Sequence, residues 1–334
     1  MRYSNRLFLY APFVALLIIA AIAMFHWRQI ANDWESRLLL ANNGQEIAPG
    51  VSLHFASEEI GGFPFNLDVV LEKCVVALQS TRGPISLASE HFAIHALTYG
   101  RAQQILEAAG LQTLTWTDAE GGTHRFVFIP GSLRASAIET EGRLARFDLD
   151  LHALRSSSLI AARAQFHIRA APDRDVLDFV IRGDDLGLQS AHLILPHLNI
   201  EGRMMHAAPL SPLLSGHDEW RRAVSDWRMN NGALRVDKMN VDWDASHVTA
   251  NGVLLLDDGN RISGEMKMQL SGVEQWRPTR LVKSSFTFAL EKLTHATLQP
   301  HAAALPLTLD VHNGAAIVST GANSRAAGSI DPVF

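Results

Sequence analysis

The histidines are the residues whose type could most readily do chemistry in this sequence, which contains 15 of them. His91 and His95 lie four positions apart, and on a helix this spacing would let both rings bind one metal ion. The surrounding segment, Ile85–Leu97, is patterned as a strand. A strand places the two rings on one face but about 13 Å apart, at ~3.3 Å per residue. We therefore expect structural or surface histidines and no metal site.

Paired carboxylates are the second candidate chemistry, because two neighbouring carboxyl groups can act as general acid and general base. Two such pairs occur at alternate positions of predicted strands, on the side that faces solvent. They are Asp148 with Asp150 and Asp242 with Asp244. Exposed strand faces carry such pairs routinely, so we predict no catalytic residue here.

The single cysteine, Cys74, excludes an intramolecular disulfide and a cysteine-based zinc cluster. No histidine is placed beside it by sequence, so we expect a buried, unreactive thiol. The sequence also lacks GxGxxG, P-loop, HExxH and GxSxG motifs. We expect no cofactor and, with no catalytic constellation identified, a protein that is not an enzyme.

One short motif stands out, the run Gly61-Gly62-Phe63-Pro64-Phe65. Two glycines permit positive φ and the proline fixes its own φ, which together favour a tight turn. We expect the turn to begin a core strand, with Phe65, Leu67, Val69 and Leu71 facing inward. The alternative is that the aromatic rings form a contact site for a ligand or partner.

The N-terminal segment sets the location that we predict. Leu7–Phe25 contains 19 residues without a charge, and as a helix it spans roughly 28 Å, close to the ~30 Å hydrocarbon core of a bilayer. Arg2 and Arg6 precede it, so the positive-inside rule predicts a cytoplasmic N-terminus and an exported remainder. Ala21-Ile22-Ala23 leaves a cleaved signal peptide as the alternative.

Composition excludes two broad classes. The chain has 334 residues, is 47% hydrophobic and carries a formal net charge of −5. The hydrophobic content is too high for an intrinsically disordered protein. The negative balance gives no electrostatic footprint for nucleic acid.

Most of the exported part alternates apolar and polar residues with a period of two, which is typical of antiparallel strands with one dry face. The clearest runs are Arg143–His152, Leu159–Ala170, Arg261–Leu270 and Leu305–His312. We predict a mainly β protein, with an N-terminal transmembrane helix followed by an extended antiparallel sheet and a few packed helices. Alternation is the same in a closed sandwich and in an open groove, so both arrangements stay open.

Three segments beyond the span have helical spacing: Trp27–Ala41, Tyr99–Ala109 and Glu219–Met229. The first would continue the anchor outward and end at Asn43-Gly44. The last carries Trp220 and Trp227 on one face. We expect these rings to pack on the sheet; contact with a partner or a membrane surface is the alternative.

Turn residues and composition suggest how the chain is organised. Glu120-Gly121-Gly122 and Asp257-Asp258-Gly259-Asn260 predict hairpins, and Asp184-Asp185 is also expected in a turn. Ala207–Gly216 is the best candidate boundary. We expect a cytoplasmic tip and anchor over 1–28, a β-rich region over 29–206, and a helix with a further β-rich region over 207–334.

Two segments of the sequence resemble known protein families. Gly61 to Leu67, GGFPFNL, is similar to the GGFPFRL-type motif of the "domain of unknown function 2125" family of bacterial envelope proteins, with Asn66 where that pattern usually has arginine. Leu234–Gly272 resembles the C-terminal region of AsmA-like envelope proteins. These resemblances imply a single-pass protein of the bacterial inner membrane with its bulk in the periplasm. The AsmA-like one implies a role with lipids, and neither implies a catalytic residue.

Three functions are compatible with these features. The first is an anchored periplasmic protein that binds or conveys lipid, or supports envelope integrity. The second is an anchored scaffold for an envelope protein complex, and the third is an envelope hydrolase. The expected partners are the inner membrane, through Leu7–Phe25, and a lipid or an envelope protein.

Overall fold

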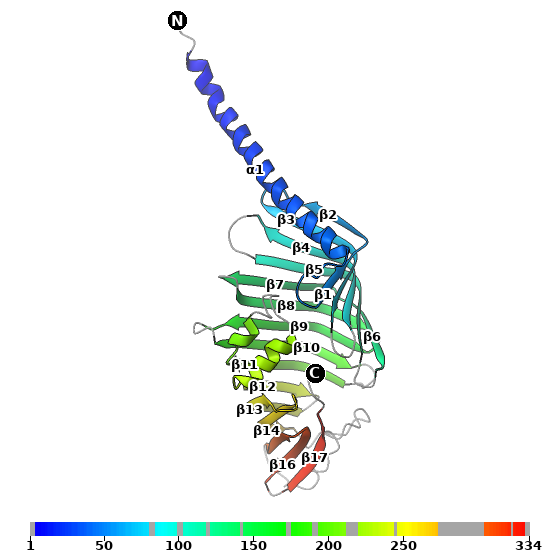
Figure 1. The fold of residues 1–334 in the computed structure, drawn as a ribbon. Helices are drawn as coiled ribbons and strands as arrows, with labels where there is room; N and C mark the ends of the chain where they lie inside the picture. Colours follow the sequence, from blue (N-terminus) through cyan, green and yellow to red (C-terminus); the bar gives the residue numbers. More distant parts are fainter. Residues whose placement is uncertain are drawn as a thin grey trace.

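The computed structural model describes most of the chain and places one long helix and a single large sheet in it. The described residues are 4–79, 84–98, 103–117, 121–140, 143–171, 175–188, 193–211, 220–243, 246–272, 304–321 and 323–330. The sheet contains 17 strands. The mainly β fold with an N-terminal apolar helix, as predicted from the sequence, is confirmed (Figure 1).

The strands follow one another in chain order. Their bounds are β1 Val51–His54, β2 Ser57–Gly61, β3 Asn66–Leu78, β4 Ile85–Leu97, β5 Gln103–Thr117, β6 Thr123–Ile129, β7 Ser132–Thr140, β8 Arg143–Ser156, β9 Leu159–Ala170, β10 Val176–Leu188, β11 Leu193–Met205, β12 Ala233–Trp243, β13 Ser246–Leu256, β14 Ile262–Ser271, β15 Leu305–His312, β16 Ala315–Thr320 and β17 Asn323–Ser329. From β3 onward each strand pairs antiparallel with the next, apart from one interruption. Such a meander pairs only strands that are close in sequence.

The interruption lies at β6 and β7, which together occupy the position of one strand. β5 pairs with β6 along Gln112–Thr117 and with β7 along Gln103–Ala108. On the other side, β8 pairs with β7 and, at its end, with β6. At the opposite edge β1 and β2 both pair with β3, one along each half of that strand.

The helix α1, Ser4–Asn42, projects from the β2–β3 end of the sheet (Figure 1). It contains Pro12, and the stretch Pro12–Asn42 includes a window of mean hydropathy 1.8 in which no residue is buried. By length and composition this helix could cross a membrane or belong to a signal sequence. It ends where the sequence predicts, because Gly44 adopts a φ of 99° and its N–H donates to the carbonyl of Ala41.

The sequence between β11 and β12 forms two small elements. The 3-10 helix η2, Ala208–Leu210, is followed after the undescribed residues 212–219 by the helix α3, Trp220–Met229. The predicted helix at 219–229 is therefore confirmed, and Asn231 and Gly232 follow its end in a turn. β11 and β12 pair directly with each other, so the strands before and after this connection belong to one sheet.

Three local predictions are wrong. Helix was expected over Tyr99–Ala109, but Gln103–Ala109 belongs to β5, and 99–102 lies outside the described residues. Ile105 and Leu106 point to opposite faces, and pairing with both β4 and β7 overrides the helical spacing. Asp184-Asp185 was expected in a turn, yet both lie inside β10, with Asp185 at a φ of 49°.

The third error concerns Phe65, which was expected in the core. Its side chain is 63% exposed, whereas Leu67, Val69 and Leu71 are buried as predicted. The strand begins one residue later, at Asn66, so Phe65 belongs to the turn and is outside the alternation of β3. The ambiguous segment Val273–Leu298 lies outside the described residues.

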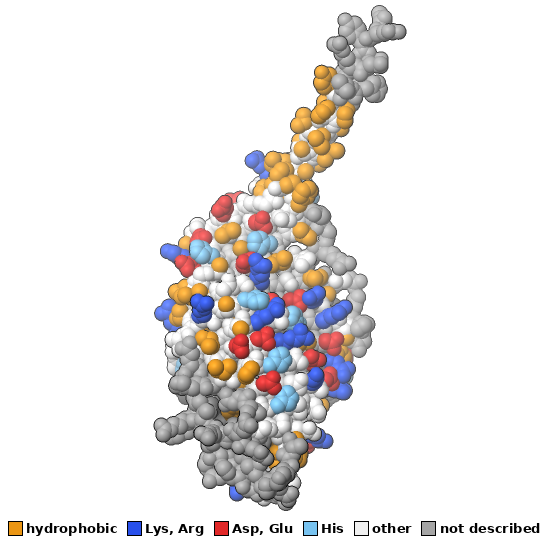
Figure 2. All heavy atoms as spheres, turned by 180° about the vertical axis from the view of Figure 1, so that it is seen from behind, with side chains coloured by type: hydrophobic (Ala, Val, Ile, Leu, Met, Phe, Trp, Pro, Cys, Tyr) orange, Lys and Arg blue, Asp and Glu red, His pale blue; other side chains and the backbone are white. Residues whose placement is uncertain are grey.

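The sheet has two chemically different faces. Figure 1 views the face on which α1 and α3 lie, and Figure 2 views the molecule from behind, where Asp, Glu, Lys, Arg and His side chains are spread over the surface. Cross-strand partners always point to the same face, so the register assigns each residue to one side. We call these the apolar face and the polar face.

Candidate functional site

The apolar face carries an unbroken row of hydrophobic cross-strand neighbours. One residue comes from each strand between β3 and β15, except β6, and each pairs in register with the next. The row, called the apolar row below, is Val69, Ile94, Leu106, Ala135, Leu149, Phe166, Ile181, Ile200, Met239, Ala250, Met268 and Leu307. At the ~4.8 Å spacing of neighbouring strands it runs for roughly 50 Å.

The two ends of the apolar row are buried, whereas its centre is partly exposed. Val69, Ala250 and Leu307 are buried. The central stretch, from Ile94 to Met239, is only half-buried at every position. In a closed sandwich such positions would face a second sheet and lose nearly all their exposure. The centre of the row instead keeps apolar surface accessible, which a long apolar ligand could cover.

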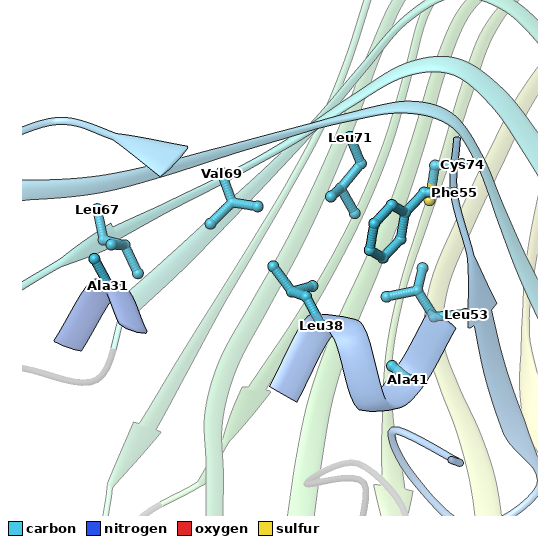
Figure 3. Close-up of a cluster of buried hydrophobic side chains, with 9 residues drawn as sticks. All are labelled: Ala31, Leu38, Ala41, Leu53, Phe55, Leu67, Val69, Leu71 and Cys74. Carbon is cyan, nitrogen blue, oxygen red and sulfur yellow. The ribbon is translucent and has the colours of Figure 1, made fainter. Parts of the chain in front are cut away.

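The first end of the row is covered by the C-terminal part of α1. Ala31, Leu38 and Ala41 of the helix pack against Leu53 and Phe55 from the β1 region and against Leu67, Val69, Leu71 and Cys74 of β3. Figure 3 shows these helix residues pointing toward the β3 side chains, with β3 and the strands behind it arching over the helix. The apolar face is therefore the concave one at this end, and α1 closes it.

A second cover lies on the same face near β11–β13. Ala223 and Trp227 of α3 pack with Leu210 of η2 and against Met204 and Leu256. Trp227 is buried, and its indole N–H donates to the carbonyl of Met205 at 2.8 Å. Trp220 is half-buried at the start of α3, with the guanidinium of Arg221 5.8 Å from its ring centre. Trp220 and Trp227 were the two candidates for contact with a partner or a membrane surface. The structure shows Trp227 packed in the interior.

Close packing at one position of the apolar face requires glycine. Gly202 of β11 lies opposite Phe179 of β10 and Val236 of β12. A Cβ at Gly202 would lie 2.7 Å from the Phe179 ring and 2.3 Å from the carbonyl oxygen of Arg235. The bulky Phe179 ring fits over the strand only because this residue has no side chain.

Histidines pair with carboxylates along the sheet, most of them across neighbouring strands on the polar face, whereas two pairs lie within one strand, in β8 and in β15. Eight histidines in the described part of the chain make such contacts, with nitrogen–oxygen distances no longer than 3.2 Å. The pairs are His91 with Glu72, His95 with Asp68, His152 with Asp150, His167 with Asp148, His197 with Asp184, His206 with Asp175, His247 with Asp242 and His312 with Asp310. In seven of these pairs the carboxylate accepts a hydrogen bond from the histidine ring, and the exception is Asp310, which lies within ion-pair distance of His312.

His91 and His95 lie on the polar face, each on its own carboxylate of β3. His91 contacts Glu72 at 2.8 Å and His95 contacts Asp68 at 2.6 Å. The hydrogen bond to Glu72 raises the pKa of His91 above its usual value, and the negative charge of Glu72 and Glu90 adds to this effect. Among the described residues, no group of three or more His, Cys, Asp or Glu side chains could hold a metal ion.

Asp148 and Asp150 are engaged in the same way. Partial burial alone would raise the pKa of Asp148, but hydrogen bonds from His167 and Arg146 outweigh it and the pKa is lowered. For Asp150 the bidentate contact from Arg163 is the main cause of a lowered pKa. A general acid needs the opposite shift at neutral pH. Asp242 accepts from His247, and Asp244 lies outside the described residues.

Cys74 lies in the core under α1 and is 1% exposed. Burial raises the pKa of its thiol to about 11. The thiolate is the nucleophilic form of cysteine, so this side chain is chemically inert in the folded protein.

The turn Gly61–Phe65 lies against α1. Gly62 has a φ of 96°, and a Cβ there would lie 2.7 Å from the carbonyl oxygen of Asn66, so a side chain does not fit. The Phe63 ring meets the Trp27 ring edge-on, with centroids 5.8 Å apart. Trp27 also donates its indole N–H to the carbonyl of Asn66 at 2.8 Å. The motif thus joins α1 to the first long strand, β3.

Sequence reasoning missed the apolar row as a unit. Alternation in single strands was visible, but the register that aligns the strands depends on turn lengths and bulges, such as those at Ser89/His91 and Val236/Met239. It also missed most of the histidine–carboxylate pairing, because in most pairs the partners belong to different strands and lie up to 31 positions apart.

The comparisons with known proteins give one result. No curated protein and no solved structure matches this chain. A family model described as an uncharacterised protein conserved in bacteria, the "domain of unknown function 2125", matches residues 27–321. The match spans most of the chain, from Trp27 at the end of the apolar span to Gly321 after β16, and it agrees with the resemblance seen in GGFPFNL. The AsmA-like resemblance of 234–272 stays a prediction. This chain therefore belongs to the DUF2125 family of bacterial proteins.

Proposed function

We propose that the protein is a single-pass protein of the bacterial inner membrane that binds or conveys lipid on the apolar row. The observation that carries this proposal is the half-buried centre of that row, which is apolar at every strand from Ile94 to Met239. An acyl chain needs a continuous apolar path without polar interruptions. The roughly 50 Å row exceeds the length of one acyl chain, which suits a surface along which lipid moves.

The proposed placement follows from α1. The helix is long and apolar enough to span a bilayer, and the preceding Arg2 and Arg6 favour a cytoplasmic N-terminus with the sheet in the periplasm. Its periplasmic continuation packs into the sheet through Ala31, Leu38 and Ala41. The first end of the apolar row therefore lies close to the point where the chain would leave the membrane.

Retention of the anchor is part of the proposal. Cleavage after Ala23 would release the sheet together with the packed part of α1, so packing alone is compatible with either form. Peptide mapping of the membrane fraction distinguishes them. A peptide that spans Ala23 is expected from the mature protein, and a mature chain that begins at Met24 would contradict the anchor.

A non-enzymatic role is also part of the proposal. The carboxylates on the polar face are paired with histidine or arginine side chains, and the pKa values of Asp148, Asp150 and Asp237 are lowered by these contacts. Cys74 is buried and has a raised pKa. These properties support binding over hydrolysis as the function of the described residues.

Site-specific photo-crosslinking in cells tests lipid binding with a matched control. Phe166 and Gln165 are adjacent on β9, both half-buried and on opposite faces. Benzoyl-phenylalanine at position 166 of the full chain should form adducts with lipid, and the same group at 165 should not. Adducts at neither position, or equally at both, would contradict the proposal. Protein adducts at 166 would instead support the scaffold function.

A further inference from the structure

The turn Gly61–Phe65 presents large aromatic surface at a defined distance from the apolar span. Phe63 is 41% exposed and Phe65 is 63% exposed. Leu97, which pairs with Asn66 at the adjoining end of β4, is 46% exposed. Phenylalanine and leucine side chains are usually buried, so three exposed ones at one corner of the sheet form an unusual surface for a protein in water.

The position of this cluster is fixed by contacts on both sides. On one side, Trp27 contacts the Phe63 ring and donates to the carbonyl of Asn66. On the other side, the backbone N–H and the hydroxyl of Thr98 both donate to the carbonyl oxygen of Phe65, at 3.1 and 2.9 Å. The turn is therefore tied to α1 through Trp27 and to the end of β4 through Thr98.

Its height above the bilayer follows from the helix. Trp27 comes two residues after Phe25, the last residue of the uncharged stretch, which is an axial rise of about 3 Å. Trp27 thus lies at the boundary of the hydrocarbon core if α1 spans the membrane. The Phe63 ring, whose centroid is 5.8 Å from that of Trp27, falls in the headgroup layer, where aromatic side chains are enriched.

We propose that the turn Gly61–Phe65 is a second membrane contact, in which Phe63 and Phe65 insert into the headgroup region of the bilayer that α1 spans. This inference rests on the proposed membrane anchor. The contact would hold the sheet at one orientation to the surface, with the first end of the apolar row next to the outer leaflet of the membrane. Lipid could then pass between leaflet and row over a short distance.

Depth-dependent fluorescence quenching tests this contact. The full chain with Phe65→Cys, labelled with an NBD fluorophore, is reconstituted in phosphatidylethanolamine–phosphatidylglycerol vesicles. Ile317→Cys is the matched control, because Ile317 is 43% exposed and lies on β16 at the end of the sheet remote from α1 (Figure 1). The wild-type chain, whose Cys74 is buried, gives the background labelling.

We expect a spin-labelled lipid with its nitroxide near the headgroup to quench the probe at 65 at least twofold more than the probe at 317. Equal quenching at both positions in protein that floats with the vesicles would overturn this inference alone. Protein that does not float with the vesicles would overturn the anchor as well. A second measurement uses a substitution that keeps an aromatic side chain at position 65. Benzoyl-phenylalanine at this position should form lipid adducts in the same vesicles, and the absence of adducts would count against the contact.

Discussion

The indole nitrogen of Trp27 and the carbonyl oxygen of Asn66 lie 2.8 Å apart, in a hydrogen bond that spans 39 positions of sequence. The bond joins the helix directly after the apolar span to the first residue of β3. Since Asn66 is also paired with Leu97 of β4, α1 and the sheet form one unit at this corner. The orientation of α1 therefore determines that of the first strands.

The turn that positions Asn66 should tolerate a side chain at Gly61 but not at Gly62. At Gly61 an added Cβ would meet nothing within 4 Å, whereas at Gly62 it would lie 2.7 Å from Asn66 O and the φ is 96°. Gly62→Ala should lower the free energy of unfolding by about 1–3 kcal/mol because a left-handed backbone is forced on alanine. Gly61→Ala should change it by less than about 0.5 kcal/mol. Denaturant unfolding of both variants measures this; equal stabilities would show that the turn is not constrained.

The packing of α1 on the sheet can be tested with two neighbouring leucines, one buried and one exposed. Leu38 is 5% exposed in the cluster with Leu53, Phe55 and Leu71, and Leu39 is 42% exposed. Leu38→Ala should cost about 2–5 kcal/mol because it leaves a cavity in the core. Leu39→Ala should cost less than about 1 kcal/mol. If both variants melt like the wild type, the helix does not contribute to the folded core.

This cluster also determines which part of the chain can be removed. From the sequence, the anchor and the β-rich region were separable at about residue 28. The structure places Ala31, Leu38 and Ala41 in the core, so a fragment that begins at Asn43 would expose Leu53, Leu67 and Val69. The continuation of helical periodicity past Phe25 was visible in the sequence. The sequence did not show that this helix packs on β3, because no local pattern identifies the apolar face against which a helix packs.

The same limit applies to the sheet. Alternation in single strands predicted which residues of β8, β14 and β15 share a face, and the structure agrees. In β9 the predicted alternation holds from Ala164 to Ile168 but fails earlier, because Ala161 is buried and Ala162 is exposed. It could not predict the strand at 103–109, where helical and strand spacing compete and only the pairing with β4 and β7 decides. It also misplaced Phe65, because a shift of one residue at the start of a strand moves a side chain out of the core.

The ion pair between His91 and Glu72 should be visible in a pH titration. The pKa of His91 is raised, mainly by the hydrogen bond to Glu72, so its folded-state value lies above the ~6.5 of an unfolded histidine. Any stabilisation by this pair is present below that pH and is lost as the pH rises through the folded-state pKa. Titration of the His91 ring by NMR should show the raised midpoint, and Glu72→Gln should lower it. Glu107→Gln, which removes a partner of Arg134, should leave the midpoint unchanged; a fall there would contradict the assignment.

Cys74 should react with thiol reagents only after unfolding. It is 1% exposed, and its pKa is raised to about 11 by burial. At pH 8 the thiolate fraction is then roughly one in a thousand, and access is blocked as well. A maleimide added to the native full chain should leave Cys74 unmodified, and the same reagent in denaturant should modify it fully. Rapid native labelling would show that the cluster under α1 opens readily.

A charge on the apolar row should reduce lipid binding, and the same charge on the opposite face should not. Ile181 and Val180 are adjacent in β10 and both half-buried. Ile181 lies between Phe166 and Ile200 in the row, whereas Val180 lies between His167 and Glu201 on the polar face. A carboxylate covered by an acyl chain loses its hydration, which costs several kcal/mol, and about 1.4 kcal/mol corresponds to a tenfold loss of affinity. Ile181→Asp should therefore decrease lipid adducts at position 166 at least tenfold, while Val180→Asp should leave them nearly unchanged.

Thermal unfolding of both variants separates this effect from a loss of folding. Equal adduct yields in two folded variants would mean that lipid does not lie along the row.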